Sequence, residues 1–167
     1  AGTFADRRNL RPRVTTVRRL VEAATATLTP QRSEPRHPYD VRVGLELEGI
    51  ALMGQRIPYR EVAQLAEDWD PEQARYGMSG SEEFKDAEEL FHIRLAELCG
   101  NPILVQYLRD VNNHIRIVRR LGLPDQDSVM QTYREHHEIC QRILANDMDG
   151  AAVMLRAHIH ESQAKSR

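Results

Sequence analysis

From residue 39 onward, the apolar residues recur at spacings of three and four, which is the repeat of an α-helix with one buried face. No stretch alternates apolar and polar residues for long enough to indicate a β-strand against a core. The pattern therefore predicts an all-α domain, and short connections between its helices favour an antiparallel six-helix bundle. We expect the helices to span residues 39–54, 58–69, 82–99, 102–120, 127–145 and 147–163.

The first 38 residues differ from the rest because they hold most of the chain's local positive excess. Their pattern predicts an extra helix over residues 15–28, followed by a break from residue 30 to 38 that contains several prolines. Such a segment is either a solvated linker with one short helix or a basic arm that touches DNA or a partner. We expect the main domain to begin at Tyr39.

Composition narrows the class of protein. The chain has 23 Lys and Arg against 25 Asp and Glu, so its net charge of −2 gives no general reason to bind nucleic acid. No apolar run is long enough to cross a membrane, and nothing near the start resembles a signal peptide, so we expect no membrane partner and a cytoplasmic location. Cys99 and Cys140 lack the spacing of a zinc motif and are expected to be buried free thiols.

Three histidines carry the clearest chemical signal. His136 and His158 each continue the apolar face of a predicted helix at spacings of three and four. On the helix predicted over 82–99, Glu88 and His92 lie four residues apart on one flank, so both side chains can reach a single ion. Imidazoles and a carboxylate suit divalent Zn, Ni, Mn or Fe. Helical phase alone leaves open the alternative that these are core histidines hydrogen-bonded to their neighbours.

Two further residues leave a choice between a binding role and an ordinary one. Arg42 and Glu46 lie four residues apart beside a buried face, so they form either an exposed ion pair or a site where Arg42 enters the bundle and binds a carboxylate. His114 lies beside the apolar stripe of the helix predicted over 102–120 and is either a pocket residue or helix surface.

Six short motifs occur in a characteristic order: Tyr39-Asp-Val-Arg42-x-x-Leu45-Glu46, Glu88-x-x-Phe91-His92, Gly100-Asn101-Pro102, Glu135-His136-x-x-Ile139, Asp147, and His158-Ile159-x-x-Ser162. Each motif is weak alone, but their order and the 22-residue step from His136 to His158 are jointly specific. Through them the chain resembles the ligand-sensing C-terminal domain, or FCD domain, of the FadR subgroup of GntR-type bacterial transcription regulators.

The resemblance implies a six-helix bundle that holds a divalent metal and binds a small carboxylate, which then alters DNA affinity. The family's metal ligands, an aspartate and three histidines, carry over to Glu88, His92, His136 and His158. Glu88 departs from the usual aspartate, which puts the affinity and identity of the metal in doubt, and some relatives bind their effector without a metal. Arg42 matches the arginine that reaches the effector, and Asn101 matches a turn residue; with His114, these are the expected effector-binding residues.

The resemblance also implies a domain order and partners. Residues 1–5 look like the last strand of the wing of a winged helix-turn-helix, residues 6–38 are the linker, and residues 39–167 form the sensing domain. We therefore expect a fragment of a homodimeric, non-enzymatic regulator whose absent N-terminal domain binds operator DNA. Two alternatives are a metal-dependent hydrolase or lyase, in which Glu88 or a nearby acid activates metal-bound water, and a bundle that only dimerises.

Overall fold

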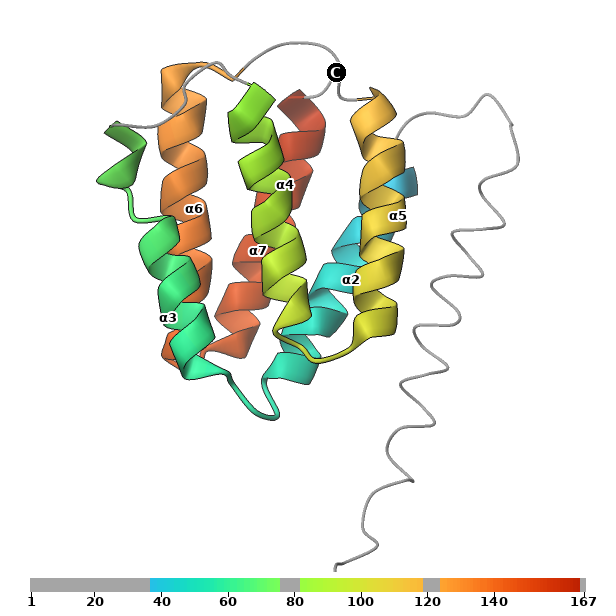
Figure 1. The fold of residues 1–167 in the computed structure, drawn as a ribbon, viewed down its shortest axis with the longest axis vertical. Coiled ribbons are helices and arrows are strands. Elements are labelled where there is room, and N and C mark those ends of the chain that lie inside the picture. The colour runs from blue at the N-terminus through green and yellow to red at the C-terminus, as the bar shows by residue number, and fades with distance from the viewer. Residues whose placement is uncertain (1–36, 76–81, 119–123, 166–167) are drawn as a thin grey trace, which may run out of the picture.

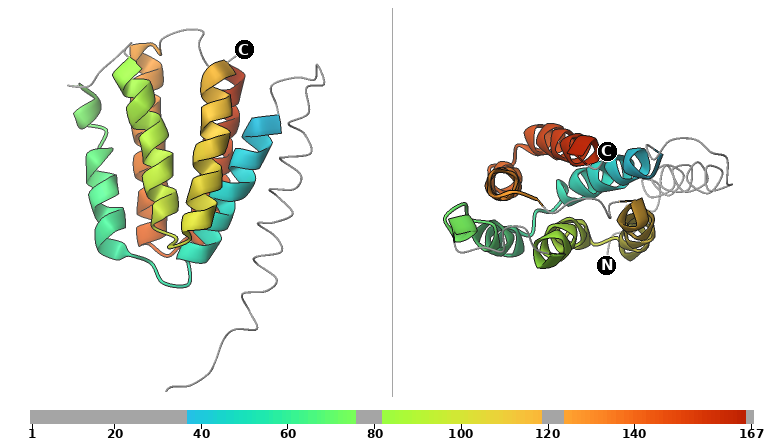
Figure 2. Two further views of the ribbon diagram at one scale, coloured as in Figure 1. Left: turned by 45° about the vertical axis from the view of Figure 1, so that its right-hand side comes forward. Right: turned by 90° about the horizontal axis from the view of Figure 1, so that it is seen from above.

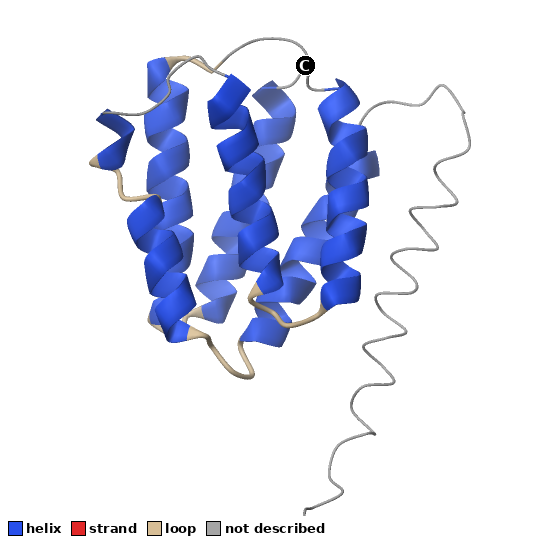
Figure 3. Ribbon diagram, in the orientation of Figure 1, coloured by secondary structure: helices blue, strands red, loops and turns tan. Residues whose placement is uncertain are grey.

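The computed structural model describes residues 37–75, 82–118 and 124–165, and the regular structure in these ranges is entirely helical (Figure 3). The α-helices are α2 (His37–Met53), α3 (Tyr59–Asp68), α4 (Glu82–Glu97), α5 (Pro102–Val118), α6 (Gln126–Leu144) and α7 (Met148–Lys165), and a 3-10 turn, η1 (Gln73–Arg75), follows α3. The predicted all-α class is confirmed, and each of the six predicted helices ends within about two residues of its observed bounds. The helix predicted over 15–28 and the segment 1–5 lie outside the described residues.

The six helices form two layers of three (Figures 1 and 2). One layer contains α3, α4 and α5, and the other contains α6, α7 and α2. Helix α3 packs on α6, and α5 packs on α2, so the two layers are joined at both sides. The middle helices α4 and α7 therefore face the interior, where polar side chains from either layer can meet.

Local sequence explains where several helices begin and end. The Asn101 side-chain oxygen accepts hydrogen bonds from the backbone nitrogens of Ile103 (3.1 Å) and Leu104 (3.2 Å), which caps the start of α5. Gly100, just before it, has a φ of 71°, in the left-handed region that favours glycine. Asp125 caps α6 in the same manner by accepting from the Ser128 nitrogen at 2.8 Å. These two caps fix where α5 and α6 begin.

An aromatic cluster supports one side of the interior. Trp69, at the C-terminal end of α3, is buried and lies edge-on to Phe91, with ring centroids 5.5 Å apart. It also contacts Phe84 and Tyr133, which come from α4 and α6. Trp69 thus joins three helices around one point, immediately beside the buried His136. None of the helices in the described ranges is long and apolar enough to cross a membrane.

Candidate metal centre

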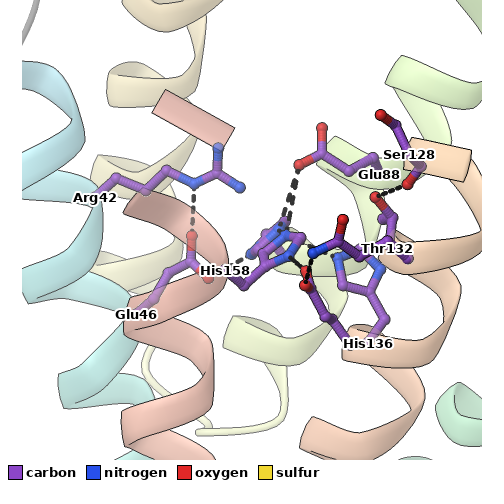
Figure 4. A network of polar contacts seen from close by, with 10 residues as sticks. Arg42, Glu46, Glu88, Ser128, Thr132, His136 and His158 are labelled. Atoms are coloured by element: carbon purple, nitrogen blue, oxygen red, sulfur yellow. Dashed lines mark hydrogen bonds and ion pairs between the residues drawn. The ribbon is translucent and has the colours of Figure 1, made fainter. Parts of the chain in front are cut away.

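Three buried histidines converge between the layers (Figure 4). His92 comes from α4, His136 from α6 and His158 from α7, and their exposed fractions are 0%, 0% and 4%. The His158 Nε2 atom lies 3.2 Å from Nε2 of His92 and 3.1 Å from Nε2 of His136. Helical phase predicted that each of these histidines points inward, and the structure brings them together.

The spacing of these nitrogens suits a metal ion. With metal–nitrogen bonds of about 2.0–2.1 Å, ligand atoms lie about 3.3 Å apart in a tetrahedral site and about 2.9 Å apart in an octahedral one. The two observed separations of 3.1 and 3.2 Å fall between these values. The three histidines can therefore hold a divalent ion through their Nε2 atoms.

Two of the three imidazoles are hydrogen-bonded to a carboxylate through the ring nitrogen that points away from the cluster. The His92 Nδ1–H donates to Glu46 Oε2 at 2.6 Å, and the His158 Nδ1–H donates to Glu135 Oε2 at 2.6 Å. An ionised carboxylate only accepts hydrogen bonds, so in each neutral imidazole the proton lies on Nδ1 and the lone pair on Nε2. A carboxylate behind an imidazole is the usual outer partner of a histidine that binds a metal.

His136 is oriented by aromatic rings instead. Its imidazole stacks on Phe91 with centroids 3.6 Å apart, and Trp69 lies edge-on to it at 4.2 Å. Its Nδ1 atom is buried with no hydrogen-bond partner. Burial, reinforced by the neighbouring His158 and His92, holds the pKa of His136 well below its usual range, so this imidazole is neutral. A neutral imidazole is the form that binds a metal.

His158 has the opposite tendency. Burial lowers its pKa, but hydrogen bonds and charge from Glu135 and Glu88 outweigh that effect and raise the pKa above its usual value. His158 therefore holds a proton more tightly than a free histidine does. A metal ion at the same point would displace that proton.

Glu88 lies beside the cluster, as the spacing of Glu88 and His92 predicted. Its Oε1 atom is 3.6 Å from Nε2 of His92 and 3.8 Å from Nε2 of His158. The longer side chain of glutamate therefore still reaches the place where the three imidazoles meet. Around the histidines, the described residues supply three carboxylates, Glu46, Glu88 and Glu135, against one guanidinium, that of Arg42. This excess of negative charge also suits a cation.

Arg42 is buried, so its ion pair with Glu46 is not the exposed pair that one interpretation of the sequence predicted. Its exposed fraction is 1%, and its Nε donates to Glu46 Oε1 at 2.7 Å. Its Nη2 atom is buried and has no hydrogen-bond partner in residues 37–75, 82–118 and 124–165. Figure 4 shows Arg42 reaching from α2 toward the labelled histidines from the left, with Glu88 at the upper right. The second interpretation, in which Arg42 enters the bundle, is the one that the geometry supports.

Two of the expected effector-binding residues lie elsewhere. The Asn101 carboxamide oxygen caps α5, as described above, which is a structural task at a helix end. His114 is exposed on α5, and its Nδ1 contacts the backbone oxygen of Asp110 at 2.8 Å, one turn earlier on the same helix. The structure does not bring either side chain into the buried cluster.

Helical phase did not predict that carboxylates would accept hydrogen bonds from the Nδ1 atoms of two histidines. Glu46 was expected only as the partner of Arg42, yet it joins Arg42 to His92 across two helices. Glu135 directly precedes His136, but its carboxylate serves His158 on the next helix. Gln131, one turn earlier, donates to Glu135 at 2.7 Å and extends this network. The only hint in the sequence was the position of Glu135 inside the motif Glu135-His136-x-x-Ile139.

The two-layered helical bundle with a buried histidine cluster defines a ligand-binding class of domain, and comparisons with known proteins agree. Residues 37–161 match the model of the FCD domain. The chain therefore belongs to the FCD domain family, and the resemblance seen in its motifs is confirmed. It is similar to the Nta operon transcriptional regulator of Aminobacter aminovorans, with 29% identity over 123 residues, which cover 74% of this chain and 57% of that protein. The chain thus spans a little over half the length of this relative, and no solved structure matches it significantly.

Proposed function

We propose that this chain contains the effector-binding domain of a DNA-binding transcription regulator. In this proposal, Glu88, His92, His136 and His158 hold a divalent transition metal such as Zn, Ni or Mn. The convergence of three buried Nε2 atoms is the observation that carries it. The family match and the similarity to a named transcriptional regulator support the regulatory role.

Arg42 would bind the carboxylate of a small organic acid. The Nε of this buried guanidinium donates to Glu46, but its Nη2 lacks an acceptor among the described residues, and a carboxylate matches the geometry of a guanidinium. The metal would supply a Lewis-acidic centre for the same anion, while the residues around it orient the histidines and exclude water. Binding would stabilise one arrangement of the bundle over another, which requires different effector affinities in the two states.

The remaining parts of the proposal concern the whole regulator. The bundle would pass the binding event to an N-terminal DNA-binding domain that contacts operator DNA. Such a regulator would act as a homodimer, because two-fold symmetric operators match two-fold symmetric proteins. A DNA-binding role in a bacterium would place it in the cytoplasm.

The direct test is the metal content of the purified chain together with its melting temperature, before and after chelation. We expect about one equivalent of a transition metal per chain and a lower melting temperature after its removal. His158→Ala should abolish the bound metal, whereas His160→Ala, at an exposed position on the same helix, should retain it. Full metal content in the His158 variant would rule out this ligand set.

A second experiment addresses the anion. Arg42→Ala should weaken carboxylate binding while the metal remains bound, because the hydrogen bond of Arg42 within the described residues goes to Glu46 and not to one of the three histidines. An unchanged carboxylate affinity would show that Arg42 serves only the ion pair with Glu46. Turnover of simple esters, phosphates or hydroxy acids that His136→Ala abolishes would instead favour the alternative of a metal-dependent hydrolase or lyase.

A further inference from the structure

A buried asparagine on α5 has no partner for its side chain among the residues that the structure describes. Asn112 is only 1% exposed, and within those residues neither its Nδ2 nor its Oδ1 atom finds a hydrogen-bond partner. It lies four residues after Leu108 and three before Ile115, both buried, so it belongs to the inward face of the helix. A buried polar group without a partner is costly, and each such group in a native protein calls for an explanation.

Two ion pairs between α4 and α5 indicate the height of Asn112, that is, its position along the long axis of the bundle. Arg116 pairs with Glu89 at 2.7 Å, and Arg109 pairs with Glu97 at 2.7 Å, so the two helices run in opposite directions. Along the sequence of α5, Asn112 lies midway between the two arginines. Along α4, the midpoint between their partners Glu97 and Glu89 is Ile93, so Asn112 and Ile93 should lie opposite each other. Asn112 is therefore level with His92, within one helical turn.

The packing of α2 on α5 gives the same height. Leu45 of α2 lies in one apolar cluster with Leu108 of α5. The two helices run in opposite directions (Figure 1), so one turn back from Leu45 and one turn forward from Leu108 lead to the same level. Those steps arrive at Arg42 and Asn112. Within the described part of the chain, two buried side chains with unpaired polar atoms thus lie on neighbouring helices, at heights that agree to within about one helical turn.

We propose that Asn112 recognises a neutral group on the effector that both donates and accepts a hydrogen bond, namely a hydroxyl or a primary amide. This inference rests on the proposed function, because Arg42 binds the carboxylate of the same molecule. An asparagine side chain offers donors on Nδ2 and an acceptor on Oδ1, so only a group with both properties satisfies it. Asn112 is then a specificity-determining residue, since an unsubstituted carboxylate would leave its amide unpaired.

The test uses four acids with the same four-carbon chain: butanoate, 2-hydroxybutanoate, 3-hydroxybutanoate and 4-amino-4-oxobutanoate. Their dissociation constants for the full chain are measured by calorimetric titration, with and without added Zn²⁺. The variant is Asn112→Leu, which has nearly the same shape, and the matched control is Asn113→Leu at the adjacent exposed position. The unfolding midpoint of each ligand-free protein is measured as well.

We expect the wild type to bind a hydroxyl-bearing or amide-bearing acid at least about tenfold more tightly than butanoate, which corresponds to the loss of one or two hydrogen bonds. The identity of the tighter acid distinguishes a hydroxyl from an amide. Asn112→Leu should abolish this preference with little change in butanoate binding, and Asn113→Leu should retain it. Asn112→Leu should also raise the unfolding midpoint without ligand, because it removes an unpaired buried amide.

The proposal is overturned if the wild type binds all four acids equally, if Asn112→Leu keeps the preference, or if that variant lowers the ligand-free midpoint. It is also overturned if none of the four acids binds to a chain that contains metal. In each of these cases the metal part of the proposed function stands. Absence of both metal and carboxylate binding would instead contradict the proposed function itself.

Discussion

The buried pair of Arg42 and Glu46 gives a quantitative prediction. Glu46 is 3% exposed and is the hydrogen-bond partner found for the Arg42 guanidinium within the described part of the chain. Glu46→Gln removes the negative charge and leaves Arg42 as a buried cation. Charge centres about 4 Å apart interact by about 4 kcal/mol at an effective dielectric constant of about 20. Breaking a buried pair by removing one partner costs about 3–5 kcal/mol, which agrees.

We therefore expect Glu46→Gln to lower the free energy of unfolding by about 4 kcal/mol and the melting temperature by about 10 °C. The assay is urea denaturation at neutral pH with a chelator present, so that metal binding does not contribute. Glu135→Gln is the control, because the Glu135 side chain is 19% exposed and its contact with His158 involves no buried guanidinium. This control should cost only about 1 kcal/mol.

The double variant Arg42→Met with Glu46→Gln separates the charge from the other contacts of Glu46. If the unpaired cation is the source of the loss, adding Arg42→Met should restore most of the stability, because an apolar side chain suits the buried position. Our reasoning is refuted if Glu46→Gln costs less than about 1 kcal/mol, or if Arg42→Met destabilises the Glu46 variant further.

Two further predictions concern pH and a helix start. Burial raises the pKa of Glu46, but its close contacts and hydrogen bonds with His92 and Arg42 outweigh burial and lower this pKa from 4.5 to about 2. The stabilisation from its ionised form is therefore complete above about pH 4.5 and is lost as the pH falls toward 2. The stability difference between metal-free wild type and Glu46→Gln should accordingly narrow between about pH 4.5 and 2, and a constant difference in urea titrations would contradict this. Gly150→Ala should cost about 1 kcal/mol, because its Cβ would lie 2.0 Å from Oδ2 of Asp147, whose other oxygen caps α7. Gly49→Ala, with nothing nearer than 4.0 Å, should not destabilise in the same thermal melts, and equal effects of the two substitutions would contradict the explanation.

Much of the site could be predicted because helical phase relates each side chain to its own helix. The three- and four-residue spacings placed His136 and His158 on buried faces, and the four-residue spacing paired Glu88 with His92. The same rule applied to α5 points to Asn112, which continues the stripe of Leu108 and Ile115, whereas His114 lies beside it and is exposed. A polar residue within an apolar stripe was therefore the more informative signal on that helix.

Other features could not be predicted because they join residues on different helices. Arg42 and Glu46 have the same four-residue spacing whether they are exposed or buried, and it is the packing of α2 against α5, α7 and α4 that buries them. The partner of Glu135 is His158, 23 positions away, and the partner of His92 is Glu46, 46 positions away. These contacts depend on which helices are neighbours and on their axial offset, about which periodicity says nothing.

The sequence by itself determined the all-α class, the approximate bounds of six helices and the inward direction of three histidines, because each of these follows from a repeat of 3.6 residues along one helix. The tertiary structure decided that the histidines meet at one point, that Glu46 and Glu135 accept hydrogen bonds from two of them, and that Arg42 and Asn112 are buried. Those outcomes depend on the order and offset of helices in two layers, which arise only when the apolar faces pack together.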